Sequence, residues 1–217
     1  MRKILTLSTV LLGCLAAMVS ACQPAPGEMD TLPSVKNGDL VFVDAGCGPL
    51  CDAISSVTAS RYNLPLSHMG IVQIVSNDTF VIEAVSKGVS RTPWQTFRQR
   101  YRDIYAGSIR QASPGFIDST LEFCRRQLGK AYDIYFLMDN DRYYCSELIY
   151  DATLYANGGV PFFELAPMTY KNLRSDAYNS HWVAYFEKLN APIPEGQPGC
   201  NPGGISLSEK ITFFKLK

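Results

Sequence analysis

Residues 67–85 read Ser-His-Met-Gly-Ile-Val-Gln-Ile-Val-Ser-Asn-Asp-Thr-Phe-Val-Ile-Glu-Ala-Val, which is two β-forming runs around a short polar segment. The stretch predicts a hairpin with strands over 68–75 and 79–85 and a turn at 76–78. Because side chains alternate between the faces of a strand, His68 and Glu83 share one face in every even-loop register. A turn centred on residues 77 and 78 would leave them four residues apart along the strands, and an earlier turn would bring them closer.

The rest of the chain predicts strands and helices around this hairpin. Further strands are predicted over 40–43, 89–94, 101–110 and 211–214. Amphipathic patterns and turn residues predict helices over 50–60, 115–129, 145–156 and from Ser180 to 189. The Pro- and Gly-rich stretch 192–204 is predicted to be a surface loop or wrap. Together these elements predict a single α+β domain over residues 37–217, with an antiparallel sheet packed with helices.

The N-terminus has the features of an export signal. Arg2 and Lys3 form a short positive segment, and residues 4–18 form an apolar run that is too short to span a bilayer comfortably. The segment Val19-Ser20-Ala21-Cys22 resembles the processing site of bacterial lipoproteins. Residues 1–21 are therefore predicted to be a signal peptide, Cys22 the lipidated residue, and 22–36 a Pro-containing tether. The alternative is an ordinary secretory peptide with an incidental cysteine.

A lipoprotein signal predicts a location in the cell envelope. The lipid anchor would supply the contact with the membrane, and the folded domain would face the periplasm. Gln23, rather than an aspartate, follows the acylated cysteine, and this indicates the outer membrane. Such an oxidising compartment permits disulfides. Cys47 and Cys51, which flank a Gly-Pro segment, are expected to be oxidised with each other or with Cys200.

The composition describes a folded domain without a strong charge bias. Hydrophobic residues make up 47% and charged residues 18% of the chain, and its formal net charge is zero. Nucleic-acid binding requires a basic surface, so no nucleic-acid partner is expected. The spacing of Cys47, Cys51 and a distant histidine is poor for zinc, so neither a metal nor another cofactor is expected.

Two side-chain types used in nucleophilic catalysis stand out. Cys145 begins a predicted helix, where unpaired N–H groups and the positive end of the helix dipole favour a thiolate. Cys124 lies in the apolar stripe of its helix and is expected to be a core thiol. A nucleophilic thiol needs a base, and His68 and His181 are the two histidines; His181, beside a tryptophan near a helix start, is typical of a structural residue. Position alone supports Cys145 equally as a nucleophile and as a small core residue.

Four segments in a fixed order carry a resemblance to a known family. They are Gly38–Phe42, Ser67–Val72, Ile82–Ala84 and Tyr144–Leu148. In this order, with histidine and acid before cysteine, the chain resembles the circularly permuted, NlpC-type papain-like hydrolases of the YiiX/YaeF family. The resemblance spans residues 38 to about 155. It implies a permuted papain-like core with Cys145 as nucleophile, His68 as base and Glu83 as third member. Tyr144 or Tyr143 would assist the oxyanion.

The resemblance implies acyl transfer through a thioester, without a metal. The leading hypothesis is an envelope amidase or peptidase that acts on a small-molecule or peptide substrate, either cell-wall peptides or N-acyl amino-acid compounds. One alternative is a lipid-directed acyltransferase or thioesterase, because relatives of the lecithin–retinol acyltransferase type share the core. Another is a non-enzymatic binding lipoprotein, against which an intact set of cysteine, histidine and glutamate argues.

Overall fold

The computed structural model describes residues 35–172 and 175–216. The predicted signal peptide, Cys22 and almost all of the predicted tether lie outside this part of the chain. All described residues belong to one compact unit, as expected for a single α+β domain.

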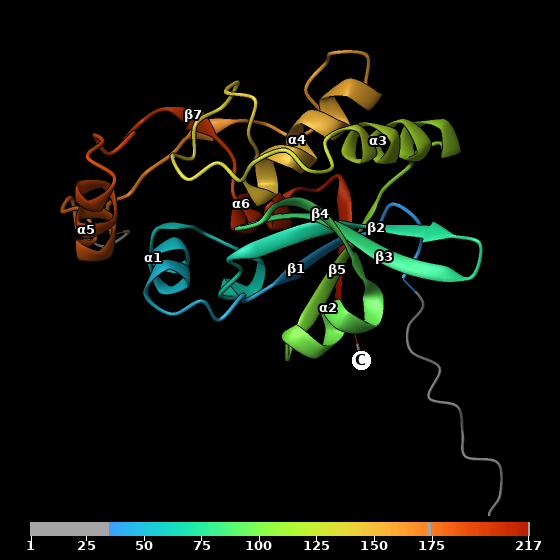
Figure 1. The fold of residues 1–217 in the computed structure, drawn as a ribbon, viewed down its shortest axis with the longest axis horizontal. Coiled ribbons are helices and arrows are strands. Elements are labelled where there is room, and N and C mark those ends of the chain that lie inside the picture. The colour runs from blue at the N-terminus through green and yellow to red at the C-terminus, as the bar shows by residue number, and fades with distance from the viewer. Residues whose placement is uncertain (1–34, 173–174, 217) are drawn as a thin grey trace, which may run out of the picture. The chain divides into compact units, whose positions relative to one another are not determined.

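The described residues build a six-stranded antiparallel sheet with the strand order β4-β3-β2-β1-β5-β8 (Figure 1). The strands are β1 (Leu40–Val43), β2 (His68–Val75), β3 (Asp78–Val85), β4 (Gly88–Pro93), β5 (Ile104–Ile109) and β8 (Ile211–Lys215). A two-stranded ribbon, β6 (Ala166–Pro167) with β7 (Pro198–Gly199), lies apart from this sheet. The predicted strands are confirmed, although the one expected from residue 101 begins at Ile104.

The central hairpin determines where His68 and Glu83 lie. Val75 pairs with Asp78 and Ile71 with Ile82, so the turn falls at Ser76 and Asn77. This register leaves His68 and Glu83 two residues apart along the strands, on one face. Gly70 permits the strands to approach closely here, because a Cβ at this position would lie 2.8 Å from the carbonyl oxygen of Ile82.

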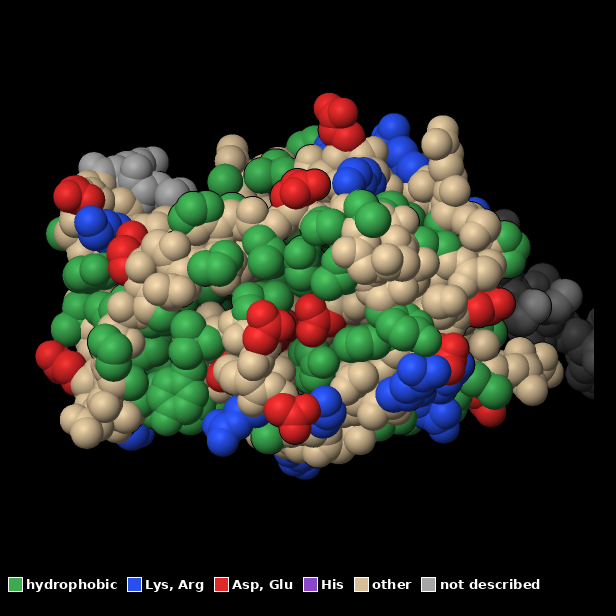
Figure 2. All heavy atoms as spheres, turned by 90° about the horizontal axis from the view of Figure 1, so that it is seen from above, with side chains coloured by type: hydrophobic (Ala, Val, Ile, Leu, Met, Phe, Trp, Pro, Cys, Tyr) green, Lys and Arg blue, Asp and Glu red, His purple; other side chains and the backbone are tan. Residues whose placement is uncertain are grey.

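The helices cover the sheet on both faces. They are α1 (Pro49–Val57), α2 (Trp94–Arg100), α3 (Pro114–Arg126), α4 (Cys145–Ala156), α5 (Ser180–Lys188) and α6 (Pro202–Leu207). α3 and α4 pack together on one face and α2 on the other (Figure 1). Phe42, Ile71 and Leu148 belong to the larger core cluster, and Val72 and Phe97 to the smaller one. On the face seen in Figure 2, acidic and basic side chains are interspersed among hydrophobic ones.

Several predicted helix boundaries need correction. α1 stops at Val57 rather than residue 60, because Thr58 adopts an extended backbone. Asn179, not Ser180, caps α5 by accepting the N–H of His181 at 2.9 Å. α2 was not predicted at all. None of the helices in the described part of the chain has the length and apolarity required to cross a bilayer.

The prediction of a surface loop over residues 192–204 is wrong for its last third. Pro202, Gly203 and Ile205 are buried in α6, which Asn201 caps by accepting the N–H of Gly204 at 2.7 Å. Gly203 packs against the backbone that follows α1, since a Cβ at this position would be 2.4 Å from the carbonyl oxygen of Ala59. This close backbone approach explains why glycine occurs within a buried helix.

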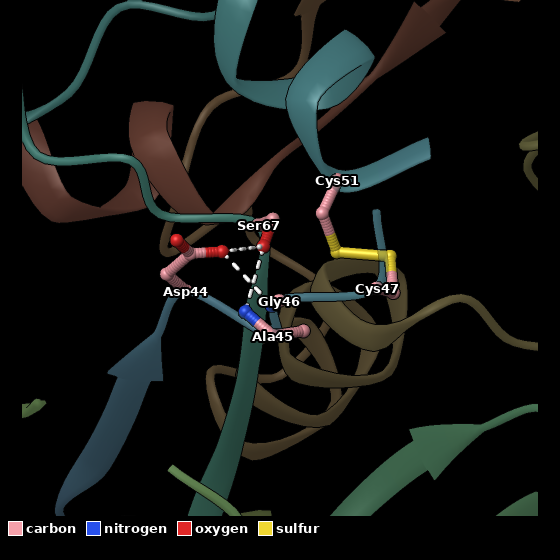
Figure 3. The surroundings of a disulfide bond; sticks show 6 residues. All are labelled: Asp44, Ala45, Gly46, Cys47, Cys51 and Ser67. Carbon is pink, nitrogen blue, oxygen red and sulfur yellow. Dashed lines mark hydrogen bonds between the residues drawn. A yellow bond between two sulfur atoms is a disulfide. The ribbon is translucent and has the colours of Figure 1, made fainter. Parts of the chain in front are cut away.

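A disulfide joins Cys47 to Cys51 just ahead of and within α1 (Figure 3). This confirms the first of the two pairings expected for these cysteines. Beside it, the Ser67 hydroxyl accepts the N–H of Ala45 at 2.9 Å and donates to the Asp44 carboxylate at 3.3 Å. These bonds connect the segment before α1 to the residue that precedes His68.

Candidate functional site

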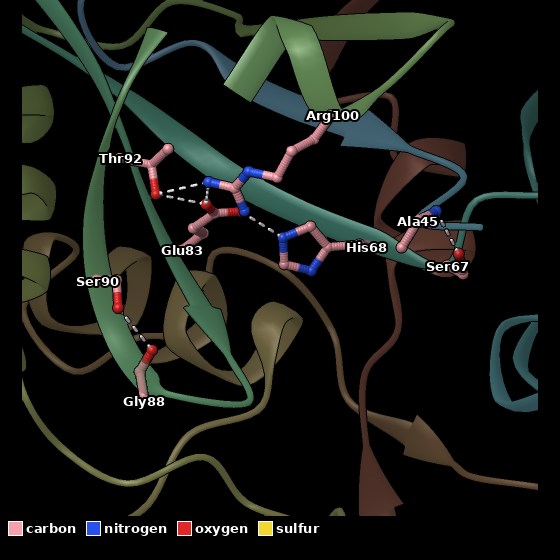
Figure 4. Close-up of polar contacts among 8 residues, drawn as sticks. All are labelled: Ala45, Ser67, His68, Glu83, Gly88, Ser90, Thr92 and Arg100. Carbon is pink, nitrogen blue, oxygen red and sulfur yellow. Dashed lines mark hydrogen bonds and ion pairs between the residues drawn. The ribbon is translucent and has the colours of Figure 1, made fainter. Parts of the chain in front are cut away.

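His68 and Glu83 form a buried hydrogen-bonded pair (Figure 4). Nε2 of His68 lies 2.7 Å from Oε2 of Glu83, and the Glu83 side chain is completely buried. An ionised carboxylate only accepts hydrogen bonds, so Nε2 carries the proton and donates it. Nδ1 is therefore the ring nitrogen left for another partner.

The second oxygen of Glu83 has partners that the sequence did not predict. The Thr92 hydroxyl donates to Oε1 at 2.6 Å, and Nη2 of Arg100 lies 3.0 Å from the same oxygen. Burial by itself raises the pKa of Glu83, but the hydrogen bond and charge of His68, followed by Thr92 and Arg100, bring this pKa below its ordinary value. Glu83 is therefore ionised at neutral pH.

His68 also faces Cys145, the first residue of α4. Burial lowers the pKa of the imidazole, but the neighbouring Cys145 and Glu83 raise it to about 9. The imidazole is therefore protonated at neutral pH. Of the described cysteines, Cys145, Cys124 and Cys200 are free thiols.

Helix α4 begins at Cys145, so this side chain lies in the first turn of the helix. The first N–H groups of a helix have no partner within it, and they give its N-terminus a partial positive charge. Tyr144 precedes the helix and donates its N–H to the Glu147 carboxylate at 3.2 Å. Burial, followed by the charges of Asp151 and Asp133, raises the pKa of Glu147 to about 8. Glu147 is therefore largely neutral at pH 7, and its own charge does not oppose a thiolate in the same turn.

The raised pKa of Glu147 predicts a loss of stability in alkaline solution. A carboxyl whose folded-state pKa exceeds its unfolded value stabilises the fold fully below about pH 4.5, and this contribution is lost as pH rises through 8. Between about pH 5 and pH 9, wild-type protein should lose about 4 kcal/mol of stability relative to Glu147→Gln. Urea denaturation at both pH values measures this, with Glu122→Gln on the exposed face of α3 as the control. Parallel pH dependence in wild type and Glu147→Gln would contradict the prediction.

A cavity of about 250 Å³ opens beside Cys145. None of the described residues that line it is charged, and they come from the N-terminal and C-terminal halves of the chain. They include Ile54 and Val57 of α1, Ser67, Tyr132, Phe136, Tyr144, Met168, Tyr170, Trp182 of α5, and Cys200 to Pro202. The hydroxyl of Tyr170 and the indole N–H of Trp182 are buried and have no hydrogen-bond partner among the described residues. The segment predicted to be a surface loop thus supplies part of this wall.

The two tyrosines before Cys145 point to different places. Tyr144 lines the cavity, and its hydroxyl accepts the N–H of Cys200 at 3.2 Å and donates to the Met138 sulfur at 3.3 Å. Tyr143 does not line the cavity; its ring lies 5.5 Å from the Lys130 ammonium group. Tyr144 alone is therefore placed near a substrate held at Cys145.

The remaining candidates have other surroundings. Cys124 is completely buried, which raises its pKa to about 12 and confirms it as a core thiol. Burial likewise raises the pKa of Cys200. His181 is exposed on α5. Thr92 and Arg100 are functional candidates that the sequence reasoning missed, since their position depends on the unpredicted turn from β4 into α2.

Comparisons with known proteins agree with this arrangement. A family described as permuted papain-like amidase enzymes, YaeF/YiiX, C92 family, matches residues 34–205. Among solved structures, the metalloprotein yiiX from Escherichia coli O157:H7 has 23% sequence identity and a TM-score of 0.69, over 82% of this chain and 96% of that one. The likeness at this identity shows a shared fold. No curated protein matches the chain.

That relative is called a metalloprotein. Across residues 35–172 and 175–216 of this chain, no group of three or more His, Cys, Asp or Glu side chains is arranged to hold a metal. The family match covers most of the sequence, and the fold agrees with it. The chain belongs to the YaeF/YiiX family of permuted papain-like amidases, which are cysteine hydrolases.

Proposed function

We propose that the protein hydrolyses amide bonds with Cys145 as nucleophile, His68 as general acid and base, and Glu83 orienting the imidazole. The observation that carries this proposal is the position of the His68 ring, which is hydrogen-bonded to Glu83 through Nε2 and lies close to Cys145. Enzymes that form covalent intermediates use the same spatial arrangement, in which a base lies between the nucleophile and a group that orients the base.

The reaction proceeds in two halves. The Cys145 thiolate attacks the amide carbonyl carbon, and backbone N–H groups at the start of α4 stabilise the oxyanion. His68 donates its proton to the amide nitrogen, the C–N bond breaks, and a thioester remains on Cys145. Water then attacks the thioester while His68 takes one of its protons. The C–S bond breaks, which releases the carboxylic acid and restores the thiolate.

The cavity indicates the substrate class. Its wall contains uncharged side chains, many of them aromatic or aliphatic. Burying a charged group there would leave the charge without a partner, at a high cost in free energy. N-acyl amino-acid compounds with an apolar acyl group therefore suit this wall better than cell-wall peptides with several carboxylates. The same wall supports the second candidate, a lipid-directed acyltransferase or thioesterase, in which a second substrate replaces water.

Trapping the intermediate tests this function. N-acyl amides of increasing acyl length are incubated with the protein, and intact-mass spectrometry is followed by peptide mapping. We expect an added mass equal to the acyl group on Cys145, followed by release of the acid into water. Cys145→Ala should show neither product, whereas Cys124→Ala should show both. Transfer to an added alcohol or amine, in place of hydrolysis, would favour the acyltransferase. Acylation elsewhere than Cys145 would refute the mechanism.

We also propose that the mature chain begins at acylated Cys22 and faces the periplasm from the outer membrane. The positive segment, the apolar run and the Val19–Cys22 site support this proposal. Several acyl chains would anchor the protein stably, since a single chain binds only marginally. Cys22→Ser should therefore move the protein into the soluble fraction or leave it unprocessed, as fractionation and N-terminal mass analysis would show. A processed Cys22→Ser variant that stays with the membranes would contradict the anchor.

A further inference from the structure

The acidic member of the proposed catalytic set is held by a side chain from outside the hairpin. Nη2 of Arg100 lies 3.0 Å from Oε1 of Glu83 and donates to the Thr92 hydroxyl at 3.0 Å (Figure 4). Thr92 in turn donates to the same Oε1 at 2.6 Å. Oε1 thus has two donors, and Oε2 is left to His68. The three contacts fix both the charge and the direction of the carboxylate.

Local structure fixes Arg100 in this position. Thr92 lies on β4, and α2 follows β4 directly, so the two residues reach Glu83 from consecutive elements. Phe97 is completely buried and packs against Trp94 and Tyr101, with ring centroids 5.9 and 4.8 Å away. This packing anchors α2, and Arg100 is its last residue.

We propose that Arg100 is a positioning residue for the reaction: its guanidinium keeps Glu83 ionised and directed at His68. The inference rests on the proposed roles of Cys145, His68 and Glu83. An exposed ion pair contributes little to a protein, because water screens both charges. Here the Arg100 side chain is 38% exposed, but its partner Glu83 is 0% exposed. A buried carboxylate that loses a charged partner tends to take up a proton, and it would then be a poorer acceptor for the imidazolium.

The charged and titratable groups around Glu83 are few in the described structure. His68 reaches it from β2, Arg100 from α2 and Tyr101 from the residue after α2, while Cys145 on α4 lies beyond the imidazole. Without Arg100, either Glu83 takes a proton and the imidazolium loses its counter-charge, or Glu83 stays charged and the region loses one positive charge. Both outcomes disfavour a thiolate at Cys145. In either case we expect alkylation of Cys145 to require a higher pH than in the wild type.

The test is the pH dependence of Cys145 alkylation by iodoacetamide, followed by peptide mass spectrometry. Arg100→Met keeps the apolar part of the side chain and removes the charge. We expect the acidic inflection of its rate profile to lie about one pH unit above that of the wild type. The inflection of Arg100→Lys should lie between those of wild type and Arg100→Met. Lysine restores the charge but not the guanidinium group that contacts both Glu83 and Thr92. Arg98→Met, on an exposed residue of the same helix, is the matched control and should follow the wild type.

Repeating the measurement in the Glu83→Gln variant distinguishes an effect of Arg100 through Glu83 from a general effect on the fold. If Arg100 acts through Glu83, the shift caused by Arg100→Met should fall to less than half when Glu83→Gln is already present. Superimposable profiles for Arg100→Met and wild type would overturn the inference, as would an undiminished shift in the Glu83→Gln background. Failure of the proposed function itself would be visible in the wild type, as Cys145 alkylation no faster than that of the buried Cys124 at any pH.

Discussion

In the His68→Ala variant, the reaction of Cys145 with iodoacetamide near pH 7 is expected to be about thirtyfold slower than in the wild type. In the proposed mechanism the protonated imidazole, which Glu83 holds through a 2.7 Å hydrogen bond, is the cation that would pair with a Cys145 thiolate. Without it, a cysteine with an ordinary pKa near 8.5 is only about 3% ionised at pH 7. Only the thiolate is alkylated, so the rate falls with its fraction.

The measurement compares rates at Cys145 from about pH 5 to pH 10 in His68→Ala and wild type. His181→Ala is the control, because His181 is exposed on α5. The two profiles should converge above about pH 9, where an ordinary thiol is itself ionised. Equal rates in His68→Ala and wild type at neutral pH would show that His68 does not activate this cysteine.

Replacement of Glu83 by alanine is expected to destabilise the protein by about 3 kcal/mol at neutral pH. The change leaves protonated His68 and the Thr92 hydroxyl without their acceptor, and it leaves Arg100 without its counter-ion. Removing one member of a buried pair costs more than the pair contributes, because the other charge stays buried and uncompensated. The side-chain volume of Glu83, which is completely buried, is lost as well.

Urea denaturation of wild type, Glu83→Ala and Glu83→Gln measures this effect. Glu83→Gln keeps the shape and one acceptor oxygen, so it should cost less than Glu83→Ala. The folded-state pKa of Glu83 lies below its ordinary value of 4.5, so its contribution is present above that pH and is lost as pH falls through the folded-state pKa. The difference between wild type and Glu83→Ala should therefore shrink in acid. A cost below about 1 kcal/mol at pH 7 would indicate that water replaces the carboxylate.

Much of the site could be predicted because its parts obey short-range rules. The alternation of side chains in a hairpin placed His68 and Glu83 on one face before any register was known, and the observed turn at Ser76 and Asn77 brought them within hydrogen-bond distance. The helix that begins at Cys145 has the predicted limits.

Two further signals were present but were not read as helices. After Pro93, aromatic residues follow the spacing of one helix face, at Trp94, Phe97 and Tyr101. This region was nevertheless predicted to contain the end of one strand, a connecting segment and the start of the next strand. Asn201 and Pro202 form a typical helix start, but the surrounding prolines and glycines indicated a loop. These two misjudged segments supply Arg100 and part of the cavity wall.

The sequence by itself determined the strands, the cysteine helix, the shared face of His68 and Glu83, and the resemblance to a family that the family match confirmed. These are properties of neighbouring residues, because backbone preference and side-chain periodicity act over one or two turns. Only the tertiary structure decided that Arg100 and Thr92 hold Glu83, and that α1, α5 and α6 contribute to a cavity whose described lining carries no charge. Those contacts join side chains far apart in the chain, and their energies arise from burial and charge pairing, which exist only once the elements have packed.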